Sequence, residues 1–426
     1  MKVLLLNQCF YPDVVSTAQY LTDLATELAE RGHSVTVIAG NRGYDDPTLR
    51  FPRREIWKGI TIIRIPALAF GKQSQWRRAL NFASFLSCCA FRLLLLRGFD
   101  VVVGLTSPPL ISFLAALFVR AKGGRFCFWV MDLNPDEAVA AGWLKAQSFT
   151  ANLLHRVLKY SLKHSTETIV LDRFTRDRVV AKGIDPRSVT IIPPWSHDDA
   201  VHYSPVGREA FRTRHGLSEK FVVMYAGNHS PCHPLDTLLE AARRLSGHGE
   251  FIFCFVGGGS ERAKVMRFAA QHQLSNIRCL PYQPLNELAA SLSAADLHTI
   301  VMGEKFVGIV HPCKVYNIMA VSAPFLYIGP EESHVTDIAE QDNGRQFYLT
   351  RHGDVERVVA SILEAASRDA DRMRSPREIH TSRFSKQQLL PRLITLIESG
   401  LDETDQEAAR AVEIPVVSTG DWRETS

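Results

Sequence analysis

The stretch KFVVMYAGNHSPCHPLDTLLEAARRL, residues 220–245, decides the fold, because an apolar run, a polar loop and an amphipathic stretch follow one another there. The run that ends at Gly227 predicts a buried strand, and the later periodicity predicts a helix that begins at residues 234–235. The free amides and the dipole of such a helix start favour an anion. We interpret the junction as an anion-binding loop to which Asn228 and His229 add hydrogen bonds, with a plain strand–helix turn as the alternative.

The same alternation of short apolar runs and helical patterns extends over most of the chain. Apolar runs of the first half are KVLLLN, SVTVIAG, ITIIRIPA, DVVVGL, RFCFWVMD, ETIVLD and VTIIPPW, and those of the second half are FIFCFVGGG, NIRCLPY, DLHTIVMG and PFLYIGP. This order is typical of parallel sheets covered by helices on both faces, whose ligands bind beyond the carboxyl ends of the strands. The sequence therefore predicts an α/β protein with two Rossmann-like domains that face one another across a crevice.

The predicted domain boundaries follow a polar connection near residue 200, where the rhythm restarts. We expect an acceptor-binding domain over 1–203, a nucleotide-sugar-binding domain over 204–385, a helix over 386–400 that packs back on the first domain, and a loose tail over 401–426.

Charge and composition describe a globular chain of 426 residues with an uneven charge distribution. Residues 1–200 hold 25 Lys and Arg against 17 Asp and Glu, a surplus of eight, whereas the remainder holds 24 against 28. The basic half favours an anionic partner such as a phospholipid surface. Nucleic acid is a weak alternative, because the cations do not gather into aromatic-interleaved runs. The eight cysteines form no CxxC pair, which favours reduced thiols in a cytoplasmic protein.

Two apolar runs are long enough to be examined as membrane spans. Arg92 interrupts the run 79–96, and two prolines break the run 101–119. We therefore expect the first run to be an amphipathic, basic-edged helix that rests on the inner leaflet, or else a buried helix of an α/β layer.

A second glycine loop follows the run FIFCFV. Gly257, Gly258 and Gly259 allow a ligand to approach the backbone closely, or they make a tight turn. The spacing is not GxGxxG in its usual context, so a nicotinamide cofactor is a weak interpretation. His229, Cys232 and His233 lack a standard metal-ligand spacing and a fourth ligand, and we expect no metal there.

The stretch MGEKFVGIVHPCKVYNIMAV, residues 302–321, predicts a helix with Pro312 at its first position and Lys314 in its first turn. A helix dipole disfavours a cation there by about 0.3–1 kcal/mol. We interpret Lys314 as a residue that holds an anion against the helix start, with a solvated surface lysine as the alternative. Glu304 and His311 flank this start, and the Glu304 carboxylate can accept hydrogen bonds from sugar hydroxyls.

Two loops of the first unit face the same crevice. Ser16 and Thr17 stand at a helix start after the first strand, where either is an ordinary N-cap. Asp132 ends a very apolar strand, and Asp136 opens the next helix, where a carboxylate is favoured. Asp132 is the candidate for contact with a reacting sugar, and a cap of a neighbouring loop is the alternative.

The ordered set FYPD, MDLNPD, IIPPWS, YAGN, FVGGG, LSAADL and HPCKVYNIMAV, which spans about residues 1–395, resembles family-4 glycosyltransferases. The resemblance is strongest to the enzymes of colanic-acid and O-antigen assembly. It implies the glycosyltransferase B (GT-B) fold, a nucleotide-sugar donor held mainly by the second domain, retention at the anomeric carbon and no essential metal. It also implies an acceptor, often a polyprenyl-diphosphate-linked sugar, bound mainly by the first domain at the cytoplasmic membrane face.

The resemblance also assigns residues. Gly227 and Asn228 match the first donor loop, Tyr282 falls where the nucleobase is held, and Lys314 matches the lysine of the proline-Ser-Lys variant. Glu304 resembles the first acid of the paired-glutamate motif, and Asn317 stands in place of the second. The expected donor-binding residues are Gly227, Asn228, His229, Gly257, Gly258, Gly259, Tyr282, Glu304, Val310, His311, Pro312, Lys314 and Asn317. The expected catalytic residues are Asp132, Glu304 and Lys314, and the expected acceptor-side residues are Ser16, Thr17, Asn134 and Asp136.

Together these features predict a hexosyl- or N-acetylhexosaminyl-type transferase that uses a UDP-sugar and a lipid-linked or saccharide acceptor in surface polysaccharide assembly. Lys314 and the two helix starts would stabilise the departing diphosphate. The expected location is cytoplasmic, at the inner face of the plasma membrane. A non-catalytic binding subunit and a nucleotide-sugar 2-epimerase are the alternatives.

Overall fold

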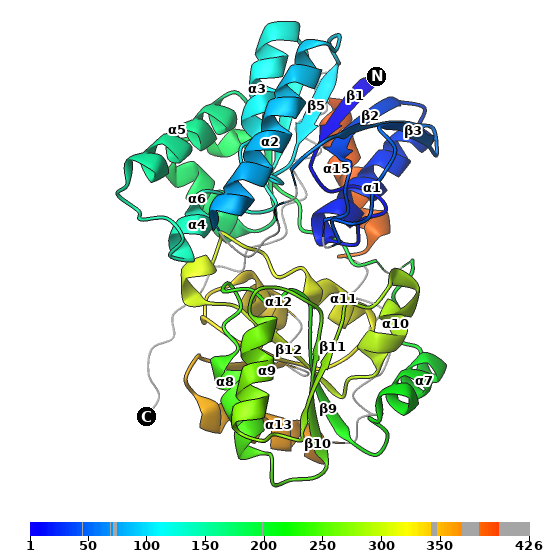
Figure 1. The fold of residues 1–426 in the computed structure, drawn as a ribbon, viewed down its shortest axis with the longest axis vertical. Helices are drawn as coiled ribbons and strands as arrows, with labels where there is room; N and C mark the ends of the chain where they lie inside the picture. The colour runs from blue at the N-terminus through cyan, green and yellow to red at the C-terminus, as the bar shows by residue number, and fades with distance from the viewer. Residues whose placement is uncertain are drawn as a thin grey trace.

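The computed structural model consists of two lobes, each built on a parallel sheet (Figure 1). It describes residues 1–399 apart from Asp45, Ala69, 71–74, Asp198, 342–346 and 369–382. The predicted tail over 401–426 lies outside the described residues.

The sheet of the first lobe has eight strands in the order β3-β4-β2-β1-β5-β6-β7-β8. Its strands are β1 (Lys2–Leu6), β2 (Ser34–Gly40), β3 (Arg54–Trp57), β4 (Ile60–Ile65), β5 (Val101–Gly104), β6 (Arg125–Trp129), β7 (Glu167–Val170) and β8 (Val189–Ile191). The edge strand β3 pairs antiparallel with β4, and the other pairs are parallel. The inner strands are apolar on both faces because helices cover both sides of the sheet.

The second sheet has six strands, all parallel, in the order β11-β10-β9-β12-β13-β14. They are β9 (Phe221–Ala226), β10 (Phe251–Val256), β11 (Ile277–Leu280), β12 (Leu297–Val301), β13 (Phe325–Ile328) and β14 (Phe347–Thr350). The chain therefore changes direction across the sheet between β9 and β12, and ligands of open α/β sheets bind at such a switch point.

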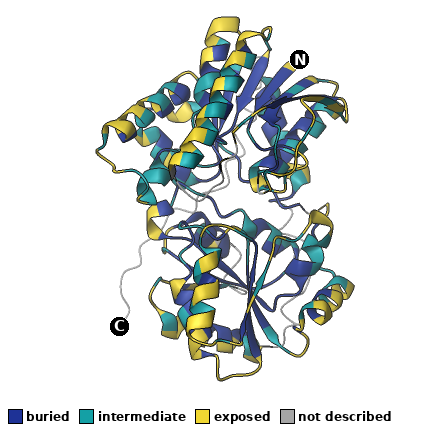
Figure 2. Cartoon of the chain, in the orientation of Figure 1, coloured by how far each residue is buried: buried dark blue, intermediate teal, exposed yellow. Residues whose placement is uncertain are grey.

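Helices pack on both faces of each sheet, as the buried interior in Figure 2 shows. In the first lobe they are α1 (Ser16–Glu30), α2 (Gln75–Leu94), α3 (Ile111–Lys122), α4 (Asp136–Ala140), α5 (Phe149–Lys163), α6 (Arg173–Ala181) and the 3-10 turn η1 (Pro186–Ser188). In the second they are α7 (Pro205–His215), α8 (Asp236–Arg244), α9 (Arg262–Gln271), α10 (Leu285–Ser293), η2 (Glu304–Phe306), α11 (Lys314–Ala320), α12 (His334–Gln341) and α13 (Val355–Ser367).

The last described helix, α15 (Lys386–Glu398), returns to the first lobe and packs beside α1 (Figure 1). Glu398 Oε1 lies 2.7 Å from His33 Nε2, and Lys386 Nζ lies 2.8 Å from Asp23 Oδ1. The chain therefore crosses from the first lobe to the second and back again, so two chain segments link the lobes.

The two apolar runs examined as membrane spans are parts of this α/β architecture. The first is α2, which buries Phe85, Cys89 and Leu93, and the second is divided between β5 and α3. Within the described ranges, no helix is both long and apolar enough to cross a membrane.

One apolar cluster connects the lobes. It contains Leu21 of α1 and Trp195 from the first lobe together with Val315 and Tyr316 of α11 from the second. The backbone N–H of Leu133 also donates to the carbonyl of Ile309 across the interface, at 2.9 Å. The lobes therefore contact one another beside the carboxyl ends of both sheets.

Candidate active site

Two glycine loops at the carboxyl ends of β9 and β10 fit against each other without side chains. Gly257 has φ +131°, and a Cβ there would lie 2.1 Å from the Gly227 carbonyl oxygen. Gly259 has φ +127°, and its Cβ would lie 2.3 Å from the His229 carbonyl oxygen. Only glycine fits both positions, so the two loops pack backbone against backbone at the end of the sheet.

Tyr282, just after β11, stands against the second loop. A Cβ on Gly258 would lie 3.0 Å from the Tyr282 ring, and the tyrosine is 41% exposed. An exposed ring beside a glycine loop offers a flat face on which a planar base can stack.

Lys314 brings its ammonium group to the first loop. Nζ lies 3.7 Å above the centre of the Tyr225 ring, and 3.1 Å from where a Cβ on Gly227 would be. The nitrogen is buried and has no hydrogen-bond partner among the described residues. Burial lowers the pKa of Lys314 to about 7. The ammonium group is thus not solvated at the surface, and only an attractive ring face opposes the loss of its hydration.

The helix that carries Lys314 begins later than the sequence predicts. α11 starts at Lys314 itself, and Pro312 precedes the helix. The reason is that Tyr316 N bonds to the Cys313 carbonyl at 3.2 Å, a tight three-residue turn that fixes the start of the helix. Lys314 still lies in the first turn, as predicted.

The two histidines of the first loop point to backbone carbonyls. His229 Nδ1 lies 3.2 Å from the Gly258 oxygen, and His233 Nδ1 lies 2.7 Å from the Val301 oxygen. Burial, and then the nearby Lys314 charge, lowers the pKa of His229 to about 4 and that of His233 to about 3. Both rings are therefore neutral near pH 7, and His229 Nε2 has no partner within the described part of the chain.

Asp132 lies beyond β6, in the first lobe. Burial, and next the charge of Glu137, raises the pKa of Asp132 to about 7. Burial likewise raises the pKa of Glu137, on α4, although a hydrogen bond from Asn134 opposes this effect. Glu137 Oε1 lies 3.8 Å from Cys232 Sγ in the loop that follows β9. No local feature of the sequence indicates that Glu137 contacts the second lobe.

Three of the residues expected on the acceptor side follow strands of this first sheet. Asp136 is paired within its own lobe, with Lys182 Nζ at 2.7 Å and His155 Nδ1 at 3.7 Å. Ser16 and Thr17 begin α1, but neither is its N-cap: Val15 holds that position, and its carbonyl accepts the N–H of Ala18 at 2.9 Å. The hydroxyls of the loop are thus not used in capping the helix.

The segment between β12 and α11 lies against the first lobe. Glu304 is exposed on η2, which contacts α4. Gly308 has φ +68°, and a Cβ there would lie 2.6 Å from the Phe174 backbone. Asn317 Oδ1 accepts the backbone N–H of His197 at 3.1 Å. The Glu304 carboxylate is thus accessible from solvent, whereas Asn317 Oδ1 already accepts a hydrogen bond from the first lobe.

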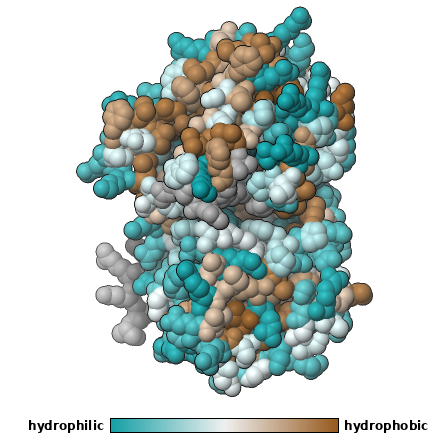
Figure 3. Space-filling model, in the orientation of Figure 1, coloured by the Kyte–Doolittle hydropathy of each residue, from teal (hydrophilic) through white to brown (hydrophobic). Residues whose placement is uncertain are grey.

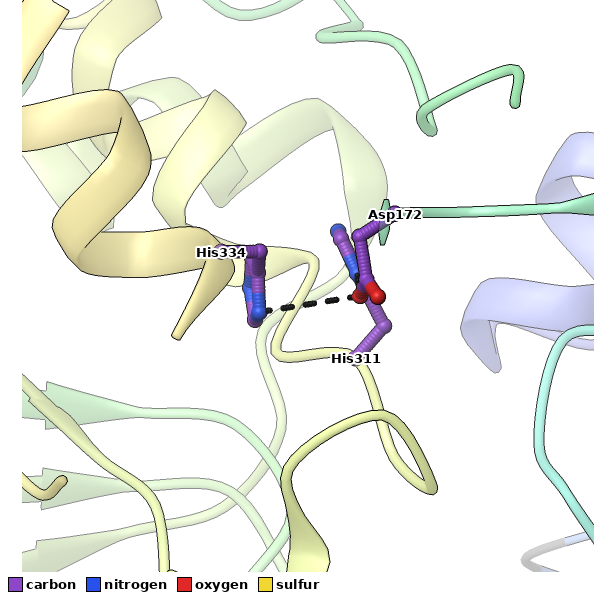
Figure 4. A group of neighbouring side chains, drawn as sticks. All are labelled: Asp172, His311 and His334. Atoms are coloured by element: carbon purple, nitrogen blue, oxygen red, sulfur yellow. Dashed lines mark hydrogen bonds and ion pairs between the residues drawn. The ribbon is translucent and has the colours of Figure 1, made fainter. Parts of the chain in front are cut away.

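His311 belongs to a buried group that sequence reasoning does not find. Its Nδ1 lies 2.6 Å from Asp172 Oδ2 of the first lobe, and its Nε2 lies 2.8 Å from the Tyr316 hydroxyl. His334 stacks on the His311 ring at 3.7 Å between centres (Figure 4). One polar atom from each of Asp172, His311 and His334 lies within 4.8 Å of the others, a spacing that a metal site can have.

The two facing parallel-sheet lobes have the GT-B fold. A profile of the glycosyl transferase 4-like domain family matches residues 17–195. This match and the two-domain fold fit a family-4 glycosyltransferase of the GT-B fold, as the sequence predicts.

Two relatives named as glycosyltransferases align with more than half of the chain. A putative colanic acid biosynthesis glycosyl transferase, WcaI of Escherichia coli K12, is 25% identical over 86% of this chain and 92% of its own length. The probable glycosyltransferase WbjE of Pseudomonas aeruginosa is 27% identical over 56% of this chain and 60% of its own.

Solved structures share the whole architecture at low sequence identity. HepE of Anabaena, in complex with UDP and glucose, has a TM-score of 0.72 at 14% identity, over 94% of this chain and 100% of that one. Sucrose-phosphate synthase of Thermosynechococcus elongatus has a TM-score of 0.73 at 14% identity, over 94% and 99%. Both likenesses extend to the two sheets and their connection.

Proposed function

We propose that the chain transfers a hexosyl or N-acetylhexosaminyl group from a UDP-sugar to a lipid-linked or saccharide acceptor, with retention, in the assembly of a surface polysaccharide. The observation that carries this proposal is the Lys314 ammonium group, which is buried beside Gly227 and lacks a hydrogen-bond partner among the described residues. A diphosphate at the glycine loops supplies the negative charge that this group needs.

The chemistry follows from the placement of charge. When the bond between the anomeric carbon and the diphosphate oxygen breaks, its electron pair goes to the diphosphate. Lys314 and the amides of the glycine loops stabilise that charge. The acceptor hydroxyl oxygen then forms the new bond to the anomeric carbon on the same face, and the hydroxyl proton passes to the departing diphosphate. Tyr282 stacks on the base, and Glu304 accepts hydrogen bonds from sugar hydroxyls. Asp132 faces the sugar from the first lobe, and contact between the lobes excludes water so that transfer outcompetes hydrolysis.

The relatives support the choice of donor and pathway. HepE was crystallised with UDP, with UDP-glucose, and with UDP and glucose, and its fold matches over nearly the whole chain. The E. coli relative is named for colanic acid biosynthesis. By analogy with HepE, we propose a UDP-sugar as the donor of this chain, and by analogy with the E. coli relative, a polysaccharide as its product.

We also propose that the reaction needs no metal, because Lys314 and the loop amides supply the positive potential at the diphosphate. Transfer should then continue in excess EDTA. A loss of activity that Mg²⁺ or Mn²⁺ restores would contradict this part of the proposal.

A membrane contact of the first lobe is part of the proposal. Trp76, Leu80, Phe91 and Leu94 recur at helical spacing along α2 and are 60%, 44%, 65% and 71% exposed. Phe149, which begins α5, is 80% exposed, and Figure 3 shows hydrophobic side chains gathered on one face of the first lobe. The exposed apolar side chains and the surplus of basic residues fit an anionic bilayer at the inner face of the plasma membrane.

Sedimentation with vesicles of anionic or neutral phospholipid tests this contact. The parent should sediment with anionic vesicles, and the double variant Phe91→Ser/Leu94→Ser should bind several-fold less. Leu363→Ser, which changes a residue 42% exposed on α13 of the other lobe, is the control. Equal binding by all three proteins would remove the membrane contact from the proposal.

The transfer itself is tested by UDP release from a panel of UDP-sugars, with and without a membrane lipid extract as acceptor. Release that depends on the acceptor, and an α-linked product from an α-linked donor, are the expected results. Release of UDP and a changed sugar without acceptor would indicate the 2-epimerase. Tight binding to an active transferase without any turnover would indicate the non-catalytic subunit, which the unusual Asn317 favours.

A further inference from the structure

Asp172 joins the two lobes through a single buried carboxylate. The residue follows β7 and caps α6, where Oδ1 accepts the backbone N–H of Thr175 at 2.7 Å. Its second oxygen, Oδ2, faces His311 Nδ1 of the other lobe at 2.6 Å. Since a carboxylate can only accept, the proton of this bond lies on His311 Nδ1. One side chain therefore fixes both a helix start and an imidazole ring across the interface.

The His311 ring is held on three sides. Asp172 contacts Nδ1, the Tyr316 hydroxyl lies 2.8 Å from Nε2, and the His334 ring stacks on one face (Figure 4). Only Pro312 and Cys313 separate this ring from Lys314, and the proline restricts the backbone of the connection. Because the connection is so short and stiff, a change in the orientation of His311 would be transmitted to the turn that starts α11.

Neighbouring residues of α6 hold the same segment from the first lobe. Arg178 Nε donates to the Val307 carbonyl at 2.7 Å, and Phe174 lies against Gly308. Arg173 makes two bonds to the Asp337 carboxylate of α12, at 2.7 and 2.9 Å. α6 therefore contacts residues 307 and 308 directly, and Asp172, which caps α6, contacts His311.

The group has the geometry of a hydrogen-bond relay rather than of a metal site. Two ligands that each lie about 2.0–2.2 Å from one ion are roughly 3 Å or more apart, and the Asp172–His311 pair is closer than that. Burial alone would raise the pKa of Asp172, but the His311 hydrogen bond and the two imidazoles outweigh it and hold the pKa well below its usual range. The carboxylate is therefore ionised and already paired.

We propose that Asp172 is a positioning residue for the donor site: its carboxylate orients His311, which fixes the start of α11 and so places the Lys314 ammonium group beside Gly227. The inference rests on the proposed function, because it assigns Lys314 to the diphosphate. It adds that contact between the lobes and the assembly of the diphosphate site are one event, coupled through this hydrogen bond.

Hydrogen–deuterium exchange tests the positioning without any substrate. Asp172→Asn keeps the size of the side chain and the acceptor for Thr175, but it places an amide donor opposite His311 Nδ1. Amide exchange across 307–320 should become at least tenfold faster in this variant. Arg173→Gln is the matched control: it removes the adjacent interlobe ion pair, so faster exchange should be confined to α12. Unchanged exchange at 307–320 in Asp172→Asn would overturn the proposal.

Binding and turnover give the second readout. Asp172→Asn should bind UDP at least tenfold more weakly and lower kcat by up to about 100-fold, the scale of a 1 Å misplacement, with the acceptor KM unchanged. Arg173→Gln should stay within about threefold of the parent. Equal losses in the two variants would show that Asp172 only joins the lobes, and would overturn the positioning role.

Two further measurements cover folding and metal. Tyr316→Phe removes the partner of His311 Nε2 and should give the same changes in smaller size, so it replaces Asp172→Asn if that variant unfolds at room temperature. One equivalent of zinc in the purified chain, lost in His334→Asn, would overturn the relay in favour of a metal site. A parent chain that binds no nucleotide, while Asp172→Asn loosens 307–320, would refute the proposed function and leave the relay intact.

Discussion

Replacing Lys314 by Met removes the positive charge from the first glycine loop and keeps the length of the side chain. A charge-assisted hydrogen bond contributes about 1.5–3 kcal/mol, and the Lys314 nitrogen has no hydrogen bond among the described residues to give up for it. At about 1.4 kcal/mol for each factor of ten, Lys314→Met should weaken UDP binding roughly 10- to 150-fold. Lys264→Met, which removes an ammonium paired with Asp236 at 2.8 Å in the same lobe, should leave it unchanged.

The pH dependence distinguishes direct contact from a general loss of fold. Burial lowers the pKa of Lys314 to about 7, so most of the free protein lacks this proton at pH 8.5. A bound diphosphate restores the charged form, and binding at pH 8.5 should therefore take up nearly one proton. The affinity of the parent for UDP should fall up to about tenfold for each pH unit between 7.5 and 9.5, whereas that of Lys314→Met should stay flat.

The contribution of Lys314 to folding stability rises with pH, whereas its contribution to UDP binding falls. The pKa of Lys314 is lowered in the folded chain, so the unfolded chain binds more protons above pH 7, and the contribution of this residue to the free energy of unfolding rises with pH. Lys314→Met should therefore raise the melting temperature most at pH 6–7 and least near pH 10.

Titration calorimetry in two buffers with different ionisation heats measures both the affinity and the proton uptake. If Lys314→Met binds UDP within twofold of the parent and takes up the same number of protons, Lys314 does not contact the diphosphate and the reasoning fails.

Three other substitutions test the surroundings of Lys314. Asp132→Asn should raise the melting temperature more at pH 8 than at pH 5. Burial raises the pKa of Asp132 to about 7, so its carboxylate destabilises the fold as the pH rises through that value. An equal gain at both pH values would contradict this reasoning. Gly257→Ala should abolish UDP binding and lower the melting temperature, since its Cβ would lie 2.1 Å from the Gly227 oxygen, while Gly247→Ala, with nothing within 4 Å, should do neither. Tyr282→Ala should weaken UDP binding about 5- to 150-fold, since base–aromatic stacking contributes about 1–3 kcal/mol; calorimetry would disprove stacking if the affinity is unchanged.

The fold could be predicted from the sequence because its signals are local. The run KFVVMYAG predicts the strand observed as Phe221–Ala226, and the periodicity of 17–31 predicts the helix observed as Ser16–Glu30. A parallel strand buried on both faces is apolar throughout, and a covering helix is apolar on one face, so each element carries its own evidence. The edge strand Arg54–Trp57 was missed because its alternating burial leaves no continuous apolar run.

The site could be predicted only where one loop contains the whole signal. The glycines at 227 and 257–259 and the lysine at a helix start are visible in short stretches of sequence. Asp172 and His311 are 139 residues apart, and Asp172 has the sequence of an ordinary helix cap. Nothing in a single sequence indicates that the second oxygen of that cap faces another lobe, because the contact depends on how the two sheets are oriented.

The proposed function gives Lys314 and Asp132 a shared role in binding the donor. They lie on opposite lobes, have opposite charges, and both have pKa values shifted to about 7 by burial, which in each case favours the neutral form. A protein that needed these charges only for stability would pair them, since a buried unpaired charge costs folding free energy. The buried charge of Lys314 lowers the free energy of unfolding mainly below pH 7, and that of Asp132 lowers it mainly above pH 7. No single pH therefore removes both costs. A diphosphate beside Lys314 and a sugar that donates hydroxyls to Asp132 would remove both costs at once, so the binding free energy of the donor is largest when the two lobes are in contact.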